Sequence, residues 1–179
     1  MLDLLKKRRS IRKYKDTPLT PEEIAQLVKA ALLAPSSKSV YPWEFIVVTD
    51  KTILDKLSNC KKNSAVFLKD APLGIVVLAD ETKSDVWVED TSIASIIIQL
   101  MAQSLGLGSC WIQVRNRMHN ETVTAEDYIK ELLNIPANYK VECIIAVGYP
   151  DQERRPRTEE SLKYDVVYEN QYGQKYTIN

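Results

Sequence analysis

The sequence predicts an α+β fold of three layers, in which helices cover both faces of a central β-sheet. Segments of helical periodicity alternate along the chain with short runs rich in β-branched residues. Most of these runs are almost continuously apolar, which is typical of strands buried on both faces. Because repeats, low-complexity tracts and Gly/Ser linkers are absent from the sequence, residues 1–179 are expected to form a single domain.

Five helices are expected. The first begins at Thr20, a favourable N-cap, because Pro21 occupies the first helical position and Glu23 completes a capping box. This helix should end before Pro35, since the residue that precedes a proline avoids the helical conformation. The other helices are expected over 50–58, 63–70, 85–105 and from Thr124, with Asp127, to the Asn-Ile-Pro at 134–136.

The expected strands cover 44–49, 73–79, 109–114 and 141–148. The helix over 85–105 carries too many apolar residues for a single stripe, so we expect it to be buried on several sides. These residues are Ile93, Ile96, Ile97, Leu100, Met101 and Leu105. The tail from Ser161 to Asn179 alternates aromatic and polar residues and is expected to form an arm. Together, the apolar helix and the tail predict a homodimer in which residues 164–179 are exchanged with the partner subunit.

The composition limits the functions to consider. Lys and Arg number 24 against 24 Asp and Glu, so the formal net charge is zero and the pI is about 6.6, which argues against binding to nucleic acid. Three widely spaced cysteines without a C-x-x-C pattern, Cys60, Cys110 and Cys143, suit buried thiols of a reduced protein. The first ten residues fit neither a secretory signal nor a membrane span, so we expect a cytoplasmic protein without membrane contact.

A basic segment near the N-terminus stands out in a chain without net charge. Seven Lys and Arg residues lie within the first fifteen positions. In an extended backbone Arg8, Ser10 and Arg12 point to one side, and in a helical turn the two arginines still share a face. Guanidinium groups and a hydroxyl then offer the donors that a compact anion such as phosphate binds. The alternative is a solvated basic helix end, which is the usual role of such runs and the one expected for Lys6 and Lys7.

A second basic group follows the last predicted strand. Arg154, Arg155 and Arg157 lie within four residues of one another. Two separate basic groups of this kind can meet in space around one phosphate, whereas a nucleic-acid site needs a broad positive surface.

Two further segments have features of ligand sites and also simpler interpretations. Residues 36–39 form a polar loop between a helix and a strand, where ligand groups often lie on a rigid scaffold, but a loop that merely ends a helix explains them too. Gly106 and Gly108 follow a long helix and precede a strand, which is the reverse of the dinucleotide-binding order and fits a glycine C-cap.

Metal-dependent and hydrolytic mechanisms lack the residues that they need. His119 is the one histidine of the sequence, so neither a histidine metal site nor a catalytic triad has support beyond a single loop residue. We expect His119 to be a surface residue. Trp43, Trp87 and Trp111 are expected in core or interface packing and not as substrate platforms, with Trp43, next to the polar loop, as the possible exception.

The order of these segments resembles the nitroreductase-like family of flavin enzymes over nearly the whole chain. The resemblance rests on four landmarks: Arg-Arg-Ser-Ile-Arg-Lys-Tyr at 8–14, Ala-Pro-Ser-Ser at 34–37 followed by Pro-Trp-Glu-Phe at 42–45, a long apolar helix that runs into Gly-Leu-Gly-Ser-Cys-Trp-Ile at 106–112, and Gly-Tyr-Pro at 148–150 followed by arginines. It implies a mixed, mainly antiparallel sheet in an intertwined homodimer that binds two FMN at the subunit interface.

The resemblance also implies which residues bind FMN. The N-terminal segment would bind the phosphate and ribityl chain, with Arg12 near N1 and the C2 carbonyl of the ring. The 35–39 loop of the partner subunit would cover the ring, the backbone at 112–114 would face N5, and two C-terminal arginines would clamp the phosphate. In this sequence the matching residues are Arg8, Arg9, Ser10, Arg12, Pro35, Ser36, Ser37, Ser39, Ile112, Gln113, Val114, Arg155 and Arg157.

The chain departs from the family pattern at several of these places. Ser39, Tyr41 and Gln113 stand where family members commonly have Asn, Gln and Gly. Because Tyr41 and Gln113 are larger or differently polar, we expect a narrower acceptor pocket and transfer no substrate. Asn63 or Ser64 is expected to supply a further flavin contact.

The implied function is that of an NAD(P)H-dependent oxidoreductase. NADH or NADPH would reduce FMN in a ping-pong mechanism, and a small electron-poor acceptor such as a nitroaromatic, a quinone or an activated alkene would reoxidise it. No catalytic side chain is assigned, because binding, orientation and electrostatics are the protein's share of such chemistry. The alternative is a non-catalytic flavin- or anion-binding protein whose basic N-terminus contacts a partner.

Overall fold

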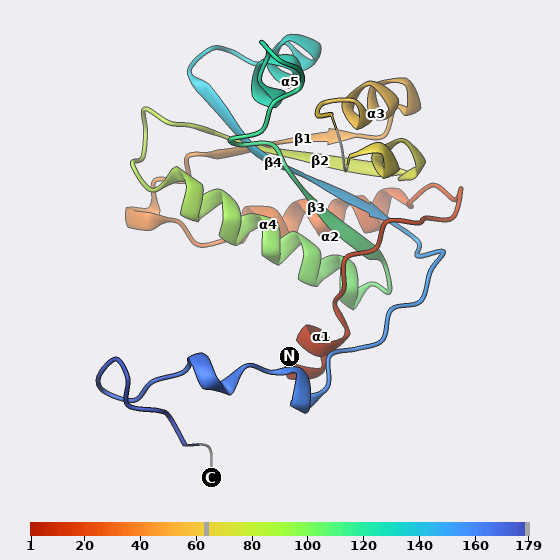
Figure 1. Ribbon diagram of the computed structural model, residues 1–179. Helices are drawn as coiled ribbons and strands as arrows, with labels where there is room; N and C mark the ends of the chain where they lie inside the picture. Colours follow the sequence, from red (N-terminus) through yellow and green to blue (C-terminus); the bar gives the residue numbers. More distant parts are fainter. Residues whose placement is uncertain (63–64, 178–179) are drawn as a thin grey trace.

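The computed structural model describes residues 1–62 and 65–177, and it contains a central sheet of four strands (Figure 1). These strands are β1 (Trp43–Val48), β2 (Leu73–Asp80), β3 (Gly108–Gln113) and β4 (Tyr139–Gly148), and their order is β1-β2-β4-β3. Every pairing between them is antiparallel. Since β3 is an edge strand, its outer side is available for other parts of the chain.

Helices cover both faces of the sheet, as the sequence predicts. Figure 1 shows α2 (Pro21–Leu32) and α4 (Trp87–Ser104) on one face, and α3 (Lys51–Ser58) and α5 (Ala125–Leu133) on the other. The short helix α1 (Leu2–Lys7) lies against α4. Four 3₁₀ turns complete the described elements: Ser37–Ser39, Val66–Asp70, Glu159–Ser161 and Tyr164–Val166.

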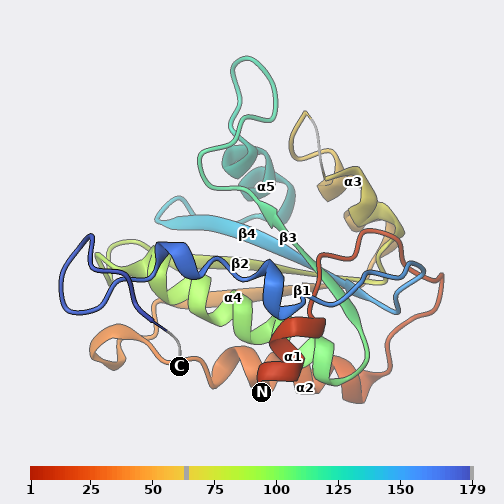
Figure 2. The same ribbon diagram turned by 60° about the horizontal axis from the view of Figure 1, so that its bottom comes forward.

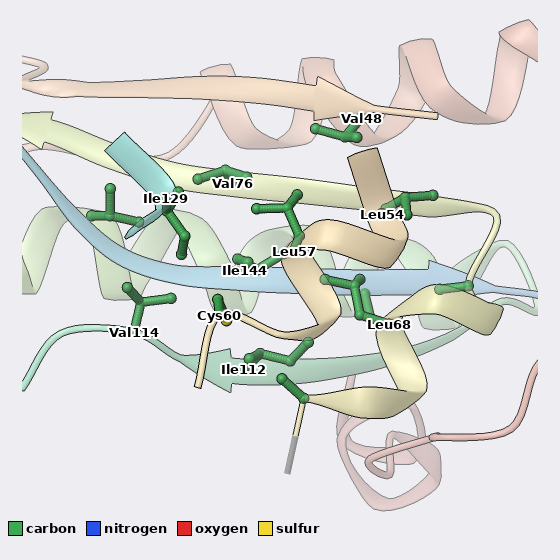
Figure 3. Close-up of a cluster of buried hydrophobic side chains, with 14 of the residues drawn as sticks. Val48, Leu54, Leu57, Cys60, Leu68, Val76, Ile112, Val114, Ile129 and Ile144 are labelled. Atoms are coloured by element: carbon green, nitrogen blue, oxygen red, sulfur yellow. The ribbon is translucent and has the colours of Figure 1, made fainter. Parts of the chain in front are cut away.

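The core lies in two halves, one on each side of the sheet. Figure 3 shows the half beneath α3 and α5, where Leu57, Leu68 and Ile144 are fully buried. On the other side Leu27 of α2 and Ile98 of α4 pack against inward-facing strand residues. Both faces of β2 and the central part of β4 are therefore buried, which explains why their sequences are almost continuously apolar.

Local signals located most helices correctly. Thr20 forms the predicted capping box with Glu23, and the Thr124 hydroxyl accepts a hydrogen bond from the backbone N–H of Asp127. Asp50 caps α3 in the same way. The residue after α5, Asn134, has a left-handed conformation that ends the helix where the sequence predicts.

Two elements differ from the expectation. The segment predicted as a helix over 63–70 forms a 3₁₀ turn at Val66–Asp70, because the chain must leave it within two residues to enter β2 at Leu73; residues 63 and 64 lie outside the described residues. The sequence did not predict α1, which has only six residues, none of them buried, and contacts α4.

The helix α4 packs on the sheet, on α2 and on α1, but part of its apolar surface stays uncovered within a single chain. Its residues Ala94, Ile98 and Ala102 are buried against the sheet, whereas Ile93 and Ile96 are 39% and 38% exposed. The expected burial on several sides is therefore met only in part in the isolated chain, because small residues and Ile98 provide the sheet-facing side and an apolar stripe at Ile93 and Ile96 is left outside.

The C-terminal tail runs along the outside of the molecule. After β4 it passes α1 and then leaves the body of the protein, as both Figure 1 and Figure 2 show. Apart from Gln152, Leu162 and Tyr168, its described residues from Asp151 onward are exposed. None of the helices in the described parts of the chain combines the length and apolar character needed to cross a bilayer.

Candidate functional site

The N-terminal basic segment lies in an extended conformation beside the outer edge of β3. Ser10 forms a parallel bridge with Ser109, and the backbone N–H of Ile11 donates to the Ser109 carbonyl at 2.9 Å. Of the two predicted conformations, the extended one is confirmed. Gly108 makes this approach feasible, because a Cβ atom there would lie only 2.7 Å from the side chain of Ile11.

One side of this extended segment lies near the thiol of Cys110. The Cys110 residue is buried on β3, and burial raises the pKa of its thiol. Arg12 and Ser10 oppose this rise in pKa, and Lys61 and Arg8 oppose it more weakly. The two guanidiniums and the hydroxyl that the sequence predicted to converge, together with Lys61, thus all lie close enough to Cys110 to lower the pKa of its thiol.

The opposite side of the segment meets the C-terminal basic group. The guanidinium of Arg9 donates a hydrogen bond to the backbone carbonyl of Arg155. The backbone N–H of Arg157 donates to the carbonyl of Lys6 at 2.9 Å. The two basic segments thus meet through the Arg9 guanidinium and backbone groups.

Lys6 and Lys7 form the basic last turn of α1, as expected of a basic helix end, and Lys6 also pairs with an acidic residue of the tail at the surface. The Nζ of Lys6 lies 2.9 Å from a carboxylate oxygen of Glu159, and this partner raises the pKa of Lys6. The contact fastens the start of the tail to α1.

The far end of β3 has an open backbone edge. Val114 directs its N–H to the carbonyl of Glu142 on β4, whereas the Ser109 carbonyl accepts a bond from outside the sheet. Because neighbouring residues of a strand direct their backbone groups to opposite sides, the N–H groups of Trp111 and Gln113 point outward. The Nζ of Lys61 donates to the outward Gln113 carbonyl at 3.1 Å, and burial lowers the pKa of that lysine. The edge therefore offers N–H donors next to cations.

The side chain of Gln113 is held by its neighbours. Its Oε1 accepts a bond from the Trp111 indole at 2.9 Å, and its Nε2 donates to the Arg115 carbonyl at 3.1 Å. Ile112 and Val114 on either side are buried. This end of the strand is thus well defined in both backbone and side chain.

The polar loop after α2 is anchored to α4 by a buried carboxylate. Asp90, which is 2% exposed in the first turn of α4, accepts bonds from the Ser36 hydroxyl at 2.8 Å and the Ser37 backbone N–H at 3.0 Å. Beyond these, Lys38, Ser39 and Tyr41 have positive φ angles of 51°, 55° and 51°. Non-glycine residues in this region are strained, and such strain is concentrated at functional sites.

This loop does not meet the basic segment within one chain. The twelve residues of α2, about 18 Å of helix, separate Pro35 from the residues that precede Thr20. Figures 1 and 2 both place the loop and the basic segment in different parts of the molecule. Of the predicted site residues, the structure therefore brings together residues 8–12, the edge of β3 and Arg155, but not residues 35–39.

Other candidates take structural roles. His119 is half-buried, its ring stacks on Tyr128 at 4.2 Å, and its Nδ1 lies 2.9 Å from the carbonyl oxygen of Asn59. Trp43 is buried in the core beside Phe45. Asn63 and Ser64, suggested as a further contact, lie outside the described residues.

Sequence reasoning missed three residues of this region. Lys61 and Asp90 carry no pattern that distinguishes them from other charged residues near helix ends. Glu142 had a readable signal, because it is a single acidic residue inside the apolar strand sequence Val-Glu-Cys-Ile-Ile. In the structure it is 4% exposed, and its Oε1 lies 3.4 Å from the Nε2 of Gln113.

Known proteins resemble this chain along most of its length. Residues 5–65 and 56–149 match the family model described as the nitroreductase family. A solved structure described as an FMN-dependent nitroreductase from Clostridium difficile R20291 is 54% identical and has a TM-score of 0.95, with 96% of this chain and all of that chain covered.

Two curated relatives extend this comparison. A protein of Archaeoglobus fulgidus with the provisional name NADH dehydrogenase/NAD(P)H nitroreductase is 41% identical over 157 residues, which are 86% of this chain and 87% of the relative. The NADPH-flavin oxidoreductase of Vibrio harveyi is 31% identical over 180 residues, which are 92% of this chain and 71% of the relative.

Proposed function

Because this chain belongs to the nitroreductase family, we propose that it is an FMN-dependent oxidoreductase that accepts electrons from NAD(P)H at the edge of β3. The resemblance predicted from the sequence, the fold class and the enzymatic character are confirmed by the family match and the structural neighbours. The site, the acceptor and the order of the reaction are proposals.

The donors at the edge of β3 fit FMN in their chemistry. A flavin mononucleotide needs cations for its phosphate, hydroxyl or amide groups for its ribityl chain, and hydrogen-bond donors for the heteroatoms of its ring. Arg8 and Ser10 lie at the start of β3, and outward N–H groups lie at Trp111 and Gln113 near its end. The strand spans six residues, about 20 Å, which matches an elongated ligand laid along it.

We assign the phosphate to the basic groups at the start of β3. Arg8 and Ser10 would bind it from the N-terminal segment. The resemblance also assigns Arg155 and Arg157 of the tail to the phosphate, but in this structure they contact the other side of that segment, through Arg9 and Lys6. Arg9 bonds the backbone of Arg155 and would hold these two segments together. The single observation that carries the proposal is the bridge between Ser10 and Ser109, because it fixes the cationic segment beside an open strand edge.

Arg12 would act on the ring. Its guanidinium lies 5.8 Å from the centre of the Phe67 ring, and its charge opposes the rise that burial causes in the pKa of the Cys110 thiol. When bound, FMN supplies the two-electron chemistry that links NAD(P)H oxidation to reduction of a nitroaromatic, quinone or activated alkene. A fixed cation at Arg12 would stabilise negative charge at the pyrimidine end of the ring. The protein thus contributes binding, orientation and electrostatics.

We propose that a second copy of this chain completes the site. The apolar stripe at Ile93 and Ile96 is exposed to solvent in the single chain, where a partner subunit could bury it. The loop at Pro35–Ser39, which includes strained residues, is too distant to contact the basic segment of its own chain. In a homodimer the partner's loop would cover the ring, and the arm at 164–179 would be exchanged between subunits. We also propose that residues 1–179 act as one domain.

Steady-state kinetics test the proposed reaction. One site that holds donor and acceptor in succession gives parallel double-reciprocal lines when both concentrations are varied. Intersecting lines would show that donor and acceptor bind together. A chain that binds FMN but has no turnover with any acceptor would instead favour the non-catalytic alternative.

A further inference from the structure

Glu142 is a buried acid that the proposed function does not use. It lies on β4 and is 4% exposed. Among the described residues its Oε2 atom has no hydrogen-bond partner, although the atom is fully shielded from solvent. Burial of a carboxyl group that is only partly satisfied destabilises a fold, so such a group requires an explanation.

A β-bulge determines where this side chain lies. In the pairing of β2 with β4, Val77 is opposite Cys143 and Leu78 is opposite Val141, so Glu142 is the extra residue. A bulge redirects side chains and occurs frequently beside active sites. Here it allows Glu142 to reach the neighbouring edge strand, where its Oε1 lies 3.4 Å from the Nε2 of Gln113.

The charged groups around Glu142 do not make it an ordinary salt bridge. The Nε of Arg115 lies 4.0 Å from Oε2, at the limit of an ion pair, and the Arg115 side chain is 41% exposed. The same guanidinium also lies over the ring of Trp87. Glu89 of α4 is the other charged group that acts on Glu142, and it is repulsive. A buried carboxyl with this surrounding is no more stabilising than an apolar residue of similar size.

The contact that remains is the one to Gln113. The Gln113 carboxamide is fixed by Trp111, by the Arg115 carbonyl and by Glu142. Its backbone N–H points to the open edge of β3. We propose that Glu142 is a positioning residue, which holds the Gln113 carboxamide and thereby the outward N–H at the end of β3. This inference rests on the proposed function, because that edge is where the FMN ring is assigned.

A double-mutant cycle on Glu142 and Gln113 tests the inference. The variants are Glu142→Leu, Gln113→Ala and the two combined, and the readouts are FMN affinity and the midpoint potential of bound FMN. Glu142→Leu should change the ratio of affinities for reduced and oxidised FMN by about tenfold, which is about 30 mV for a two-electron couple. In a protein that already carries Gln113→Ala, Glu142→Leu should cause no further change in this ratio, because Glu142 acts through Gln113.

Two further variants separate positioning from charge and from folding. Glu142→Gln keeps an acceptor for the Gln113 amide, so bound FMN should have the same midpoint potential as in the native protein. If the charge of Glu142 is what matters, the potential should instead shift as it does in Glu142→Leu. If Glu142→Leu fails to fold, Trp111→Phe removes another anchor of the same carboxamide and should shift the potential in its place. Glu131→Leu, on the exposed face of α5, is the control and should change neither readout.

The outcomes are distinct. Additive effects of Glu142 and Gln113, or a native potential in both Glu142→Leu and Trp111→Phe, would overturn the positioning role while leaving the flavin proposal intact. A native protein that takes up no FMN would overturn the proposed function itself, and with it this inference.

Discussion

The Nζ atom of Lys61 donates a hydrogen bond to the backbone carbonyl of Gln113 across 3.1 Å. This contact joins the loop after α3 to the end of β3, and it places an ammonium group at the strand edge where FMN is assigned. Burial lowers the pKa of Lys61, because a charge at this position is partly desolvated.

Replacing Lys61 by Met should weaken FMN binding. The substitution removes a charge-assisted hydrogen bond and a cation near the ring, so affinity should fall by about tenfold. Lys61→Arg should retain most of the affinity. The neighbouring Lys62 is exposed, and Lys62→Met is the matched control. Fluorescence titration with FMN measures the difference, and equal affinities in both Met variants would remove Lys61 from the site.

Arg8→Ala should reduce FMN affinity without changing the potential of the bound flavin. Hydrogen bonds between a guanidinium and a phosphate contribute roughly 1.5 to 3 kcal/mol, so the dissociation constant should rise by about one to two orders of magnitude. Arg9→Ala should have a smaller effect, since Arg9 bonds the Arg155 backbone. If Arg8→Ala binds FMN with unchanged affinity, Arg8 does not bind the phosphate and the segment is only a solvated basic turn.

Arg12→Ala should lower the midpoint potential of bound FMN. A cation beside the ring attracts the anionic reduced form more than the oxidised form, so its removal weakens the reduced complex more. Each tenfold loss of that preference corresponds to about 30 mV. Spectroelectrochemistry of the Arg8 and Arg12 variants side by side separates the two roles. Equal affinity losses with unchanged potentials would make Arg12 a second phosphate ligand.

Disrupting the apolar stripe of α4 should release monomers and FMN together. Ile96 is 38% exposed in the single chain, and Ile96→Glu would place a charge in the proposed subunit interface, whereas Ile96→Val keeps the surface apolar. Truncation after Lys163 should weaken the dimer as well. Size-exclusion chromatography with detection of flavin absorbance follows both events. A yellow, stable monomer in either variant would contradict the shared site.

Stability should depend on pH through Glu142. Burial raises the pKa of this carboxyl group, while Gln113 and Arg115 oppose the rise, so the folded state favours the protonated acid. Its contribution to folding is therefore full below the usual glutamate range near pH 4 and is lost as pH rises through the raised pKa. The free energy of unfolding of Glu142→Gln, relative to the native chain, should increase as the pH rises from about 4 through the raised pKa of Glu142. Urea titrations measure it, and a constant difference would contradict the assigned burial.

The sequence was sufficient wherever the determining interactions are local. The cap formed by Thr20 and Glu23 located α2, and side-chain alternation along an extended backbone placed Arg8, Ser10 and Arg12 on one side. The contacts of Lys61 and Glu142 with Gln113 span 52 and 29 residues, and they depend on strand order and on a bulge. No local pattern encodes such contacts.

The strained loop was also beyond sequence reasoning. Lys38, Ser39 and Tyr41 have left-handed conformations without the glycine that normally signals them. Their geometry depends on the anchor that Asp90 provides to Ser36 and Ser37 from a different helix. Likewise, only the folded chain shows that the apolar side of α4 is left uncovered.

Absorption spectroscopy of the purified full chain, mixed with FMN and then titrated with NAD(P)H without oxygen or acceptor, tests the central claim most directly. We predict a yellow protein that binds one FMN per chain and loses its visible flavin absorbance when NADH or NADPH is added. A colourless protein that takes up no FMN, or bound flavin that neither nucleotide bleaches, would contradict the assignment of a flavin oxidoreductase site to the edge of β3.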